Sequence, residues 1–162
     1  MEISTVDKSQ IREASRFAQN VFIDYYNGLI GNSQATYMAD LFLSEEAIEK
    51  LIDDGAIFKV VKDQGDILGF TEYKKEDERF FLSKLYVEKN HRHQGIGRMM
   101  FNDCLNHAIE SNISKIYLTV NKHNTPSYDT YIHLGFKVID AVENDIGNGY
   151  IMDDYIMEYI IQ

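Results

Sequence analysis

The first part of the chain combines one short extended segment with apolar side chains at helical spacing. Residues 3–6 predict a strand, and Asp7, with Gln10 three residues later, predicts a capped helix start. Apolar side chains then recur every three or four positions, which predicts an amphipathic helix. These side chains are Ile11, Ala14, Phe17, Ala18, Val21, Phe22 and Tyr25. Residues 27–33 predict a turn after this helix.

A second helical segment is predicted from Ser44, and strands follow it. Two glutamates come directly after this serine, which suits the cap and the first turn of a helix, and Gly55 predicts its end. The apolar pattern then changes to a period of two, or to short apolar runs, at 57–61, 67–73 and 80–87. These three segments predict strands joined by hairpins.

The second half of the chain predicts helices between strands. A helical apolar face begins at Gly97, and the apolar run at 116–120 predicts the next strand. A strand, a helix and a second strand in this order predict a crossover connection and therefore a parallel pair. Two last strands are predicted at 136–142 and 150–161.

A short helix is predicted before the last two strands. Thr125 precedes Pro126, which predicts a helix start with threonine as the cap and proline at the first helical position. Gly135 predicts the end of this helix, because glycine adopts the left-handed conformation that follows many helices.

The composition is that of an ordinary folded protein. The chain has 162 residues, of which 44% are hydrophobic and 26% are charged, with one proline. This length predicts a single domain over residues 1–162. No apolar run approaches the roughly 20 residues of a membrane span, and the first residues lack the pattern of a signal peptide. We therefore expect a cytoplasmic protein that binds no membrane.

Cysteine and histidine positions do not predict a metal site. Cys104 is the only cysteine, and it lies on the apolar face of a predicted helix, where we expect a core residue. His91 and His93 lie on a basic loop, where contacts with solvent or a cofactor are expected rather than metal ligation. We therefore expect no metal cofactor.

The charge is strongly negative and unevenly distributed. Sixteen Lys and Arg against 26 Asp and Glu give a net charge of −10, which predicts no nucleic-acid partner. Residues 17–49 contain no Lys or Arg, and six acidic residues but no Lys or Arg follow Lys137. Residues 84–98 have the opposite character, with four basic residues and one glutamate. The chain therefore keeps one local basic patch.

The basic patch contains the strongest chemical signal of the sequence. A predicted strand runs into a loop with Arg92, Gly95 and Gly97, and an amphipathic helix follows. Glycines let backbone N–H groups turn toward a ligand, and a helix start carries partial positive charge. This arrangement predicts a cradle for a pyrophosphate, although a tight strand-to-helix turn would give the same short pattern. The loop has neither a P-loop lysine nor a dinucleotide-binding glycine pattern.

A second motif lies about 30 residues downstream. Asn124, Tyr131, Gly135 and Phe136 match the pattern NxxAxxxYxxxGF, with Ser127 at the position of the usual alanine. Together with [RQ]xxGx[GA] in the basic loop, this motif resembles the GNAT superfamily of acyl-CoA N-acyltransferases over nearly the whole chain. The resemblance implies an α/β fold with a mixed central sheet of about seven strands, a splay between the fourth and fifth strands, and about four flanking helices.

The resemblance also implies how acetyl-CoA, the expected co-substrate, is bound. The end of the fourth strand would pair its main chain with the pantetheine arm, as a peptide adds to a sheet edge. The basic loop would bind the pyrophosphate, and the second motif would supply further contacts. The residues implied are Leu85, Tyr86, Val87, Arg92, His93, Gln94, Gly95, Ile96, Gly97, Arg98, Asn124 and Tyr131.

Direct attack of an amine on the thioester is the implied reaction. Tyr131 would protonate the departing thiolate, and a base must deprotonate the amine, whose pKa is about 10.4 in water for an alkylammonium. Protein-lysine acetyltransferases of this superfamily carry a glutamate on the fourth strand, where this chain has Phe81. Glu72 on the adjoining strand is the candidate base, and a water relay past Tyr73 or Tyr86 is the alternative.

The acceptor expected from the charge pattern is a small cationic amine. In this fold the first two helices and the loop between the last two strands commonly wall the acceptor site, where the stretches without Lys or Arg fall. The C-terminal sequence also resembles bacterial spermidine/spermine N-acetyltransferases, which suggests a polyamine. The alternatives are acetylation of protein or peptide N-termini and a regulatory module that binds acyl-CoA without turnover. Apolar residues of the last two strands are compatible with a homodimer.

Overall fold

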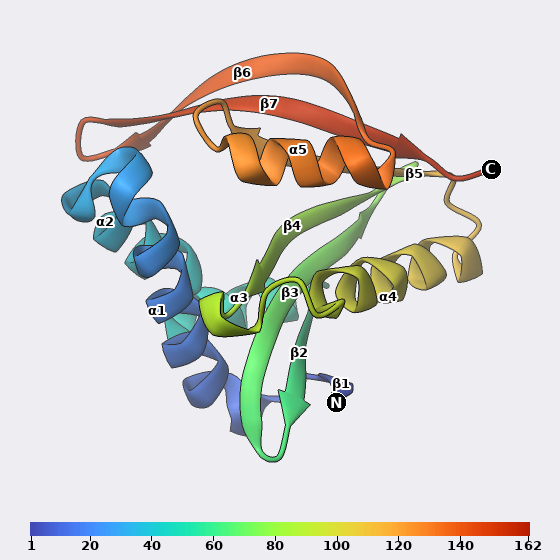
Figure 1. The fold of residues 1–162 in the computed structure, drawn as a ribbon, viewed down its shortest axis with the longest axis horizontal. Helices are drawn as coiled ribbons and strands as arrows, with labels where there is room; N and C mark the ends of the chain where they lie inside the picture. Colours follow the sequence, from blue (N-terminus) through green and yellow to red (C-terminus); the bar gives the residue numbers. More distant parts are fainter. The chain divides into compact units, whose positions relative to one another are not determined.

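Seven strands form one mixed sheet in the computed structural model, which describes residues 1–162 (Figure 1). The strands are β1 (Glu2–Thr5), β2 (Ile57–Asp63), β3 (Asp66–Glu76), β4 (Arg79–Val87), β5 (Lys115–Asn121), β6 (Lys137–Gly147) and β7 (Tyr150–Ile160). Their order in the sheet is β1-β2-β3-β4-β5-β7-β6. β4 and β5 are parallel, as the crossover predicts, whereas β1–β2, β2–β3, β5–β7 and β6–β7 are antiparallel.

Five α-helices accompany the sheet, one more than predicted. They are α1 (Ile11–Ile30), α2 (Asn32–Leu43), α3 (Glu45–Asp53), α4 (Ile96–Glu110) and α5 (Thr125–Leu134). Two short 3-10 helices, η1 (Lys8–Gln10) and η2 (Lys89–His91), precede α1 and α4. None of these helices combines the length and the apolar character that crossing a bilayer requires.

Internal contacts group the chain into two compact units. The N-terminal unit comprises Met1–Lys74 and Leu82–Asn106. The C-terminal unit comprises Lys75–Phe81 and His107–Gln162. The boundaries cross β3, β4 and α4, so each of these elements contributes to both units.

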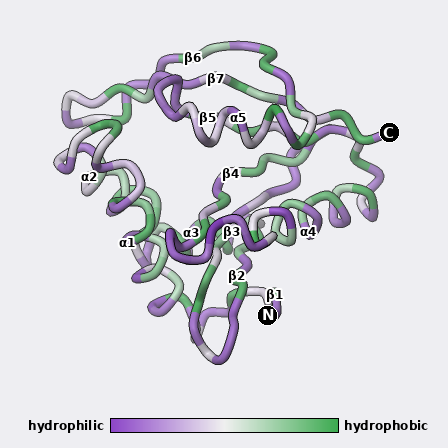
Figure 2. Tube along the Cα trace, viewed as in Figure 1, coloured by the Kyte–Doolittle hydropathy of each residue, from purple (hydrophilic) through white to green (hydrophobic).

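Apolar faces and capped helix starts build the N-terminal unit as the pattern predicts. Asp7 and Gln10 form the predicted capping box at η1, which runs directly into α1, and Ser44 Oγ accepts the N–H of Ala47 at the start of α3. α1, α2 and α3 pack against one another. The tip of the β2–β3 hairpin, which carries Asp63 and Asp66, is hydrophilic (Figure 2).

The predicted turn at residues 27–33 is wrong, because one glycine is enough to separate two helices. α1 continues through Gly28 to Ile30, and only Gly31 leaves helical geometry, with a φ of +85° that favours glycine. Its N–H bonds Asn27 O at 3.1 Å, and its carbonyl accepts the N–H of Ala35 at 3.0 Å in α2. α2, which was not predicted, buries four apolar side chains. These are Ala35, Met38, Ala39 and Leu43.

The C-terminal unit packs α5 and the residues after it onto β7. The Tyr155 ring lies 5.7 Å from Tyr128, and the Tyr159 ring lies 5.5 Å from Phe136. Gly135 ends α5 with a φ of +109°, as predicted. The helix begins one residue earlier than predicted, because the cap is Asn124, whose Oδ1 accepts the N–H of Ser127 at 3.3 Å.

Pairing between β4 and β5 is confined to the beginning of both strands. Phe80 and Phe81 lie opposite Ile116 and Tyr117, and this register includes no later residue of β4. β5 nevertheless continues to Asn121 and pairs with β7 along its whole length. The register of β4 with β5 therefore covers only the first part of β4.

Candidate active site

The loop between β4 and α4 begins with a locally capped turn. Glu88 Oε2 accepts the N–H of Asn90 at 2.9 Å and lies 2.7 Å from His91 Nδ1. The hydrogen bond from His91 is the main cause that lowers the pKa of Glu88 below its ordinary value. The N–H of Glu88 bonds Leu68 O on β3 at 2.9 Å, so the loop starts from a fixed point on the sheet.

Two residues with positive φ shape the second part of this loop. His93 has a φ of +64° and Gly95 a φ of +84°, and α4 starts at Ile96. The first hydrogen bond of the helix runs from the N–H of Met99 to Gly95 O at 3.0 Å. The N–H groups of the preceding three residues therefore lack an intrahelical acceptor and carry the positive end of the helix dipole. Such a helix start fits a phosphate group.

The structure requires glycine at only one of the two glycine positions of the motif. At residue 95 the backbone conformation requires it, since a side chain is strained at a φ of +84° even though a Cβ there would meet no atom within 4 Å. Gly97 has no positive φ, and a Cβ there would meet Leu85 Cδ2 at 3.6 Å, which is an ordinary contact. The packing of the protein itself therefore does not require glycine at residue 97. A ligand that approaches the backbone closely would require it.

Contacts with β2 and β3 fix α4 behind the loop. A Cβ on Gly69 would lie 2.8 Å from Ile96 Cγ2, so glycine allows the helix to approach β3. The Tyr73 hydroxyl donates to Asp103 Oδ2 at 2.5 Å, and Lys59 Nζ lies 3.2 Å from Asp103 Oδ1. Gly69 and Asp103 were not predicted, because neither lies in a recognisable motif. An isolated glycine within a predicted strand is the one signal that marks such a close approach.

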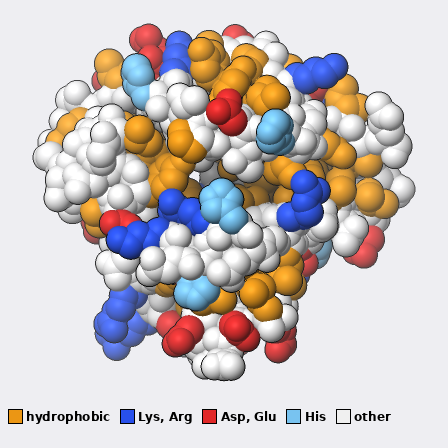
Figure 3. All heavy atoms as spheres, in the orientation of Figure 1, with side chains coloured by type: hydrophobic (Ala, Val, Ile, Leu, Met, Phe, Trp, Pro, Cys, Tyr) orange, Lys and Arg blue, Asp and Glu red, His pale blue; other side chains and the backbone are white.

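The charged side chains of the loop are unequally exposed. Arg92 is half-buried, and its Nε donates to Val87 O at 3.2 Å, whereas Arg98 is exposed. His93, Gln94 and Gly95 are exposed, and Ile96 is buried in the core. Lys, Arg and His side chains surround the segment where β4 runs into α4 (Figure 3). The predicted loop residues therefore lie together in one basic segment of the N-terminal unit.

The end of β4 carries aromatic and apolar side chains next to this loop. Leu85, Tyr86 and Val87 are half-buried. The Tyr86 ring stacks on Phe70 of β3, with 6.5 Å between the ring centroids, and meets the edge of Phe22 of α1 at 5.9 Å. The side chains of this segment therefore have fixed neighbours within the N-terminal unit.

Glu72, the candidate base, is buried and already paired. Only 4% of Glu72 and 9% of Lys84 are exposed, and Lys84 Nζ donates to Glu72 Oε1. Lys84 Nζ also lies 3.1 Å from Ser83 Oγ, and the Thr71 hydroxyl donates to Lys84 O at 2.7 Å. Sequence reasoning missed the partner Lys84, because only the register between β3 and β4 reveals it.

Aromatic packing surrounds Phe81, the residue that the family resemblance implies at the position of the glutamate of protein-lysine acetyltransferases. The Phe81 ring stacks on the Tyr117 ring, with 4.7 Å between the centroids. Arg79 Cζ lies over the same Tyr117 ring, 3.7 Å from its centroid. The Tyr117 hydroxyl donates to Glu76 Oε1 at 2.6 Å. Burial, followed by the Glu76 hydrogen bond, raises the pKa of Tyr117 to about 12. This cluster therefore holds its tyrosine neutral at physiological pH.

The predicted residues of the second motif belong to the C-terminal unit. Asn124 is buried, and its side chain caps α5, as described above. Tyr131 is half-buried on the same helix, and its ring meets Phe136 edge-on, with 5.6 Å between the centroids. The motif therefore has a structural role in folding α5, beside the chemical role that the family resemblance implies for it.

Asp154 is a buried carboxyl group that sequence reasoning missed. It lies on β7 opposite Asn121 of β5, and 4% of it is exposed. Burial, and then the charge of Asp153, raise the pKa of Asp154 to about 6, although Lys122 acts in the opposite direction. Alternation along β7 is irregular here, with buried residues at positions 154 and 157, so the pattern gave no signal.

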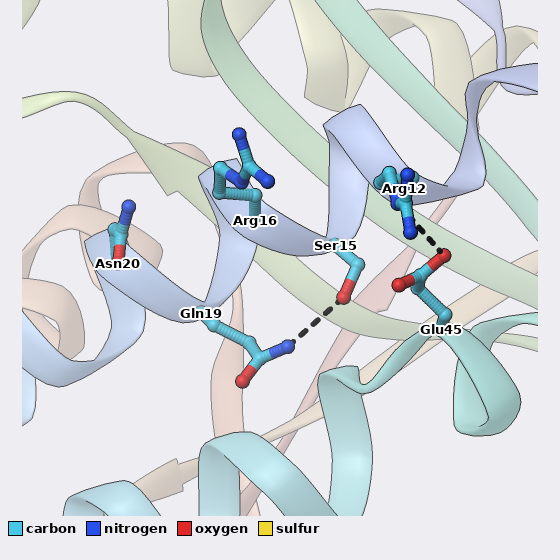
Figure 4. Close-up of a pocket in the computed structure, with 6 residues that line it drawn as sticks. All are labelled: Arg12, Ser15, Arg16, Gln19, Asn20 and Glu45. Carbon is cyan, nitrogen blue, oxygen red and sulfur yellow. Dashed lines mark hydrogen bonds and ion pairs between the residues drawn. The ribbon is translucent and has the colours of Figure 1, made fainter.

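A polar cavity of about 450 Å³ lies elsewhere in the N-terminal unit (Figure 4). Its lining comes from α1 and α3 and comprises Arg12, Ser15, Arg16, Gln19, Asn20 and Glu45. Ser15 Oγ and Gln19 Nε2 bind Leu43 O at the end of α2, at 2.6 and 3.3 Å. None of the predicted site residues lines this cavity.

Across the chain, no cluster of His, Cys, Asp and Glu side chains has an arrangement that would hold a metal ion.

Comparison with known proteins assigns the fold and the family. Residues 19–136 match the family model described as the acetyltransferase (GNAT) family. The solved structure of a PaiA N-acetyltransferase from Thermoplasma acidophilum in complex with coenzyme A superposes with a TM-score of 0.83 at 20% identity, over 99% of each chain. A GCN5-related N-acetyltransferase from Rhodopseudomonas palustris gives a TM-score of 0.84 at 12% identity, over 99% of this chain and 95% of that one.

A curated relative matches part of the sequence. Streptothricin acetyltransferase from Streptomyces lavendulae is 29% identical over 94 residues, which is 57% of this chain and 50% of that protein. The match thus extends over half the length of the relative. The family model, in contrast, includes the loop at Gly95 and the second motif up to Phe136. This chain therefore belongs to the GNAT family of acetyltransferases.

Proposed function

We propose that the protein transfers the acetyl group of acetyl-CoA to a primary amine of a small cationic acceptor, such as a polyamine. The observation that carries the proposal is the strand-to-helix loop, where Gly95 has a φ of +84° and the first N–H groups of α4 lack helical partners. A relative with the same fold binds coenzyme A. Acetyl-CoA supplies an activated acyl group as its thioester.

The residues that bind acetyl-CoA in this proposal come from three segments. The N–H groups from Arg92 to Arg98 bind the pyrophosphate, because a helix start with an adjacent positive-φ turn concentrates donors and positive charge. The main chain of Leu85, Tyr86 and Val87 pairs with the pantetheine amides, which suits a strand whose described pairing with β5 ends at Phe81. Asn124 and Tyr131 contact the same molecule.

Tyr131 is the proposed general acid. Its phenol gives a proton to the departing thiolate, a role that a neutral phenol performs at physiological pH. The edge-on contact with Phe136 restricts the ring, which keeps the hydroxyl in one region of space. Restricting a catalytic side chain before substrate binds reduces the entropy lost in the reaction.

Glu72 is the proposed base, and its ion pair with Lys84 sets a condition for that role. The amine of the acceptor must reach the Glu72 carboxylate while its Oε1 accepts the hydrogen bond from the Lys84 ammonium. The second oxygen, Oε2, is the atom that would accept the proton directly or through water. The water relay past Tyr86 remains the alternative. Tyr73 suits it less, because its hydroxyl donates to Asp103 at 2.5 Å.

The choice of a cationic acceptor follows from charge. The protein carries a net charge of −10, and residues 17–49, which include most of α1, all of α2 and part of α3, contain no Lys or Arg. A negative field raises the local concentration of cations and their association rate. The relative named for streptothricin and the resemblance of the C-terminal sequence to spermidine/spermine acetyltransferases support an amine acceptor.

A panel of acceptors tests this function. Release of free thiol from acetyl-CoA is measured with spermidine, spermine, other small diamines, and peptides with a free N-terminus. We expect turnover with the polycations, and a rate that falls with ionic strength because the attraction is screened. Turnover with peptides alone would contradict the small-amine proposal. Binding of acetyl-CoA without thiol release from any acceptor would instead indicate a regulatory module.

The assembly that we propose is a homodimer formed through the last two strands. Large apolar side chains of these strands are exposed, which leaves apolar surface for a second copy of the chain to cover. They are Val138, Ile139, Ile151 and Ile160. Light scattering after size exclusion tests the proposal, since a mass near 18.8 kDa at micromolar concentration would contradict it. The cytoplasmic location and the single domain over residues 1–162 stay predictions.

A further inference from the structure

The guanidinium of Arg92 is held by groups of the N-terminal unit that carry no negative charge. Its Nε donates to Val87 O at 3.2 Å, and its Cζ lies 5.0 Å from the centroid of the Tyr25 ring on α1. The side chain is half-buried, in contrast to the exposed Arg98 on the other side of Gly95. Arg92 therefore has a defined place before any ligand binds.

The C-terminal half of α1 contacts the end of β4 and the loop at two other points. The Phe22 ring, one turn before Tyr25, meets the edge of Tyr86 at 5.9 Å. Asp24 Oδ2 lies 3.8 Å from Lys89 Nζ, a contact between exposed groups that contributes little on its own. These contacts place the part of α1 that carries Tyr25 beside the end of β4 and the loop.

We propose that Tyr25 is a positioning residue for acetyl-CoA, because it orients the Arg92 guanidinium toward the diphosphate without neutralising its charge. An aromatic face attracts a cation through its quadrupole. A carboxylate in the same place would attract the cation more strongly but would compete with the phosphates for it. The tyrosine ring orders the arginine and leaves its full positive charge for the ligand. This inference depends on the proposed function, in which the loop binds the diphosphate.

The size of the effect follows from two contributions. A free arginine side chain loses rotamer entropy when it becomes ordered, and prior ordering avoids part of that loss on binding. The energy of a partly exposed cation–π contact is similar to or smaller than this. Loss of the ring should therefore weaken acetyl-CoA binding by roughly three- to tenfold.

Calorimetric titration of the full chain with coenzyme A tests the proposal without any need for turnover. Tyr25→Leu should weaken binding by roughly three- to tenfold, whereas Tyr25→Phe, which keeps the ring, should stay within about twofold of the wild type. The affinity for pantetheine, which lacks the diphosphate, should be the same in all three proteins. Tyr26→Leu is the matched control, since Tyr26 belongs to the same aromatic cluster but the ring that Arg92 covers is that of Tyr25.

A double-mutant cycle with Arg92→Gln completes the test. If Tyr25 acts through Arg92, Tyr25→Leu should have no further effect on coenzyme A affinity in the Arg92→Gln background. Wild-type affinity of Tyr25→Leu, an equal loss for pantetheine, or additive effects of the two substitutions would each overturn the proposal. Tyr25→Met replaces Tyr25→Leu if the smaller side chain prevents folding. Failure of the wild type to bind coenzyme A would instead overturn the proposed function.

Discussion

The ammonium of Lys84 on β4 donates to the carboxylate of Glu72 on β3, and both side chains are buried. The Thr71 hydroxyl donates to the Lys84 carbonyl at 2.7 Å, so two side-chain contacts join the two strands here. Leu85 follows directly and begins the segment proposed to pair with the pantetheine arm. The ion pair therefore holds β4 to β3 at the point where the proposed binding segment starts.

Breaking this pair should destabilise the protein strongly. Glu72→Gln leaves the Lys84 ammonium buried without a counter-charge, and Lys84→Met leaves the carboxylate in the same situation. Each should lower the free energy of unfolding by roughly 3–5 kcal/mol, whereas the double variant Glu72→Leu/Lys84→Met should recover most of this loss. Urea unfolding of the four proteins measures it. Single variants as stable as the wild type would show that the pair does not form in solution.

The double variant also tests the proposed base. If Glu72 accepts the amine proton, the folded double variant should lose at least about a hundredfold in kcat/KM. Acceptor-dependent turnover by this variant should be measurable only at high pH, where the amine is already neutral. A double variant with wild-type kcat/KM at neutral pH would exclude Glu72 and leave the water relay as the alternative.

Tyr131→Phe should separate chemistry from binding. Loss of the phenolic proton should lower kcat by about a hundredfold or more, while the affinity for acetyl-CoA should remain, because the ring and its contact with Phe136 are retained. Single-turnover kinetics and calorimetry measure the two quantities separately. Tyr128→Phe on the same helix is the control. Unchanged turnover in Tyr131→Phe would make Tyr131 a packing residue.

The two glycines of the loop should respond differently to alanine. Gly95→Ala forces a side chain into a φ of +84° and should cost roughly 1–2 kcal/mol of stability. Gly97→Ala should preserve or increase stability without ligand, because its Cβ would make only an ordinary contact with Leu85 and alanine favours a helix. Both variants should bind coenzyme A more weakly than the wild type. Undiminished coenzyme A affinity in Gly97→Ala would place the ligand away from this loop.

Asp154 should make stability depend on pH in a defined direction. Its pKa is about 6 in the folded protein and ordinarily 3.8, so the folded state binds the additional proton between these values. The free energy of unfolding should therefore fall as pH rises from about 4 to about 6 and then level off. The total change would be roughly 3 kcal/mol. Asp154→Asn should remove this fall, and urea unfolding at several pH values measures it.

Asp153→Asn is the matched control for this pH effect. Asp153 lies beside Asp154 but forms an ion pair with Lys122 at 2.9 Å. Its replacement removes a neighbouring negative charge and should reduce the pH-dependent fall without abolishing it. Equal pH dependence in the wild type and in Asp154→Asn would refute the assignment to this carboxyl group.

The sequence predicted those parts of the fold whose signals are local. Alternation and short apolar runs located β2 to β5, and Gly55 and Gly135 marked helix ends. α2 was missed because it contains a single charged side chain, Asp40, and therefore shows no clear polar face. Gly28 suggested a turn but lies inside α1, where packing with α2 and α3 outweighs the low helix propensity of glycine.

The candidate site was predictable where a motif fixed the residues and unpredictable where pairing did. The motifs located Gly95 at a positive φ and the helix that carries Tyr131. The partner of Glu72 depends on the register between β3 and β4, which no local pattern encodes. Tyr25 reaches Arg92 from a helix more than 60 residues away in sequence, so only the folded chain brings the two together.

Amide NMR spectra of the labelled protein during titration with coenzyme A show directly whether the loop before α4 binds the diphosphate. We expect saturable shifts of the backbone N–H resonances from Gly95 to Arg98, since these groups are proposed to bind the diphosphate. Pantetheine should leave the same resonances almost unchanged. Saturable shifts confined to other regions, such as the cavity beside Arg12 and Arg16, or no shifts at all, would show that the diphosphate does not bind at this loop.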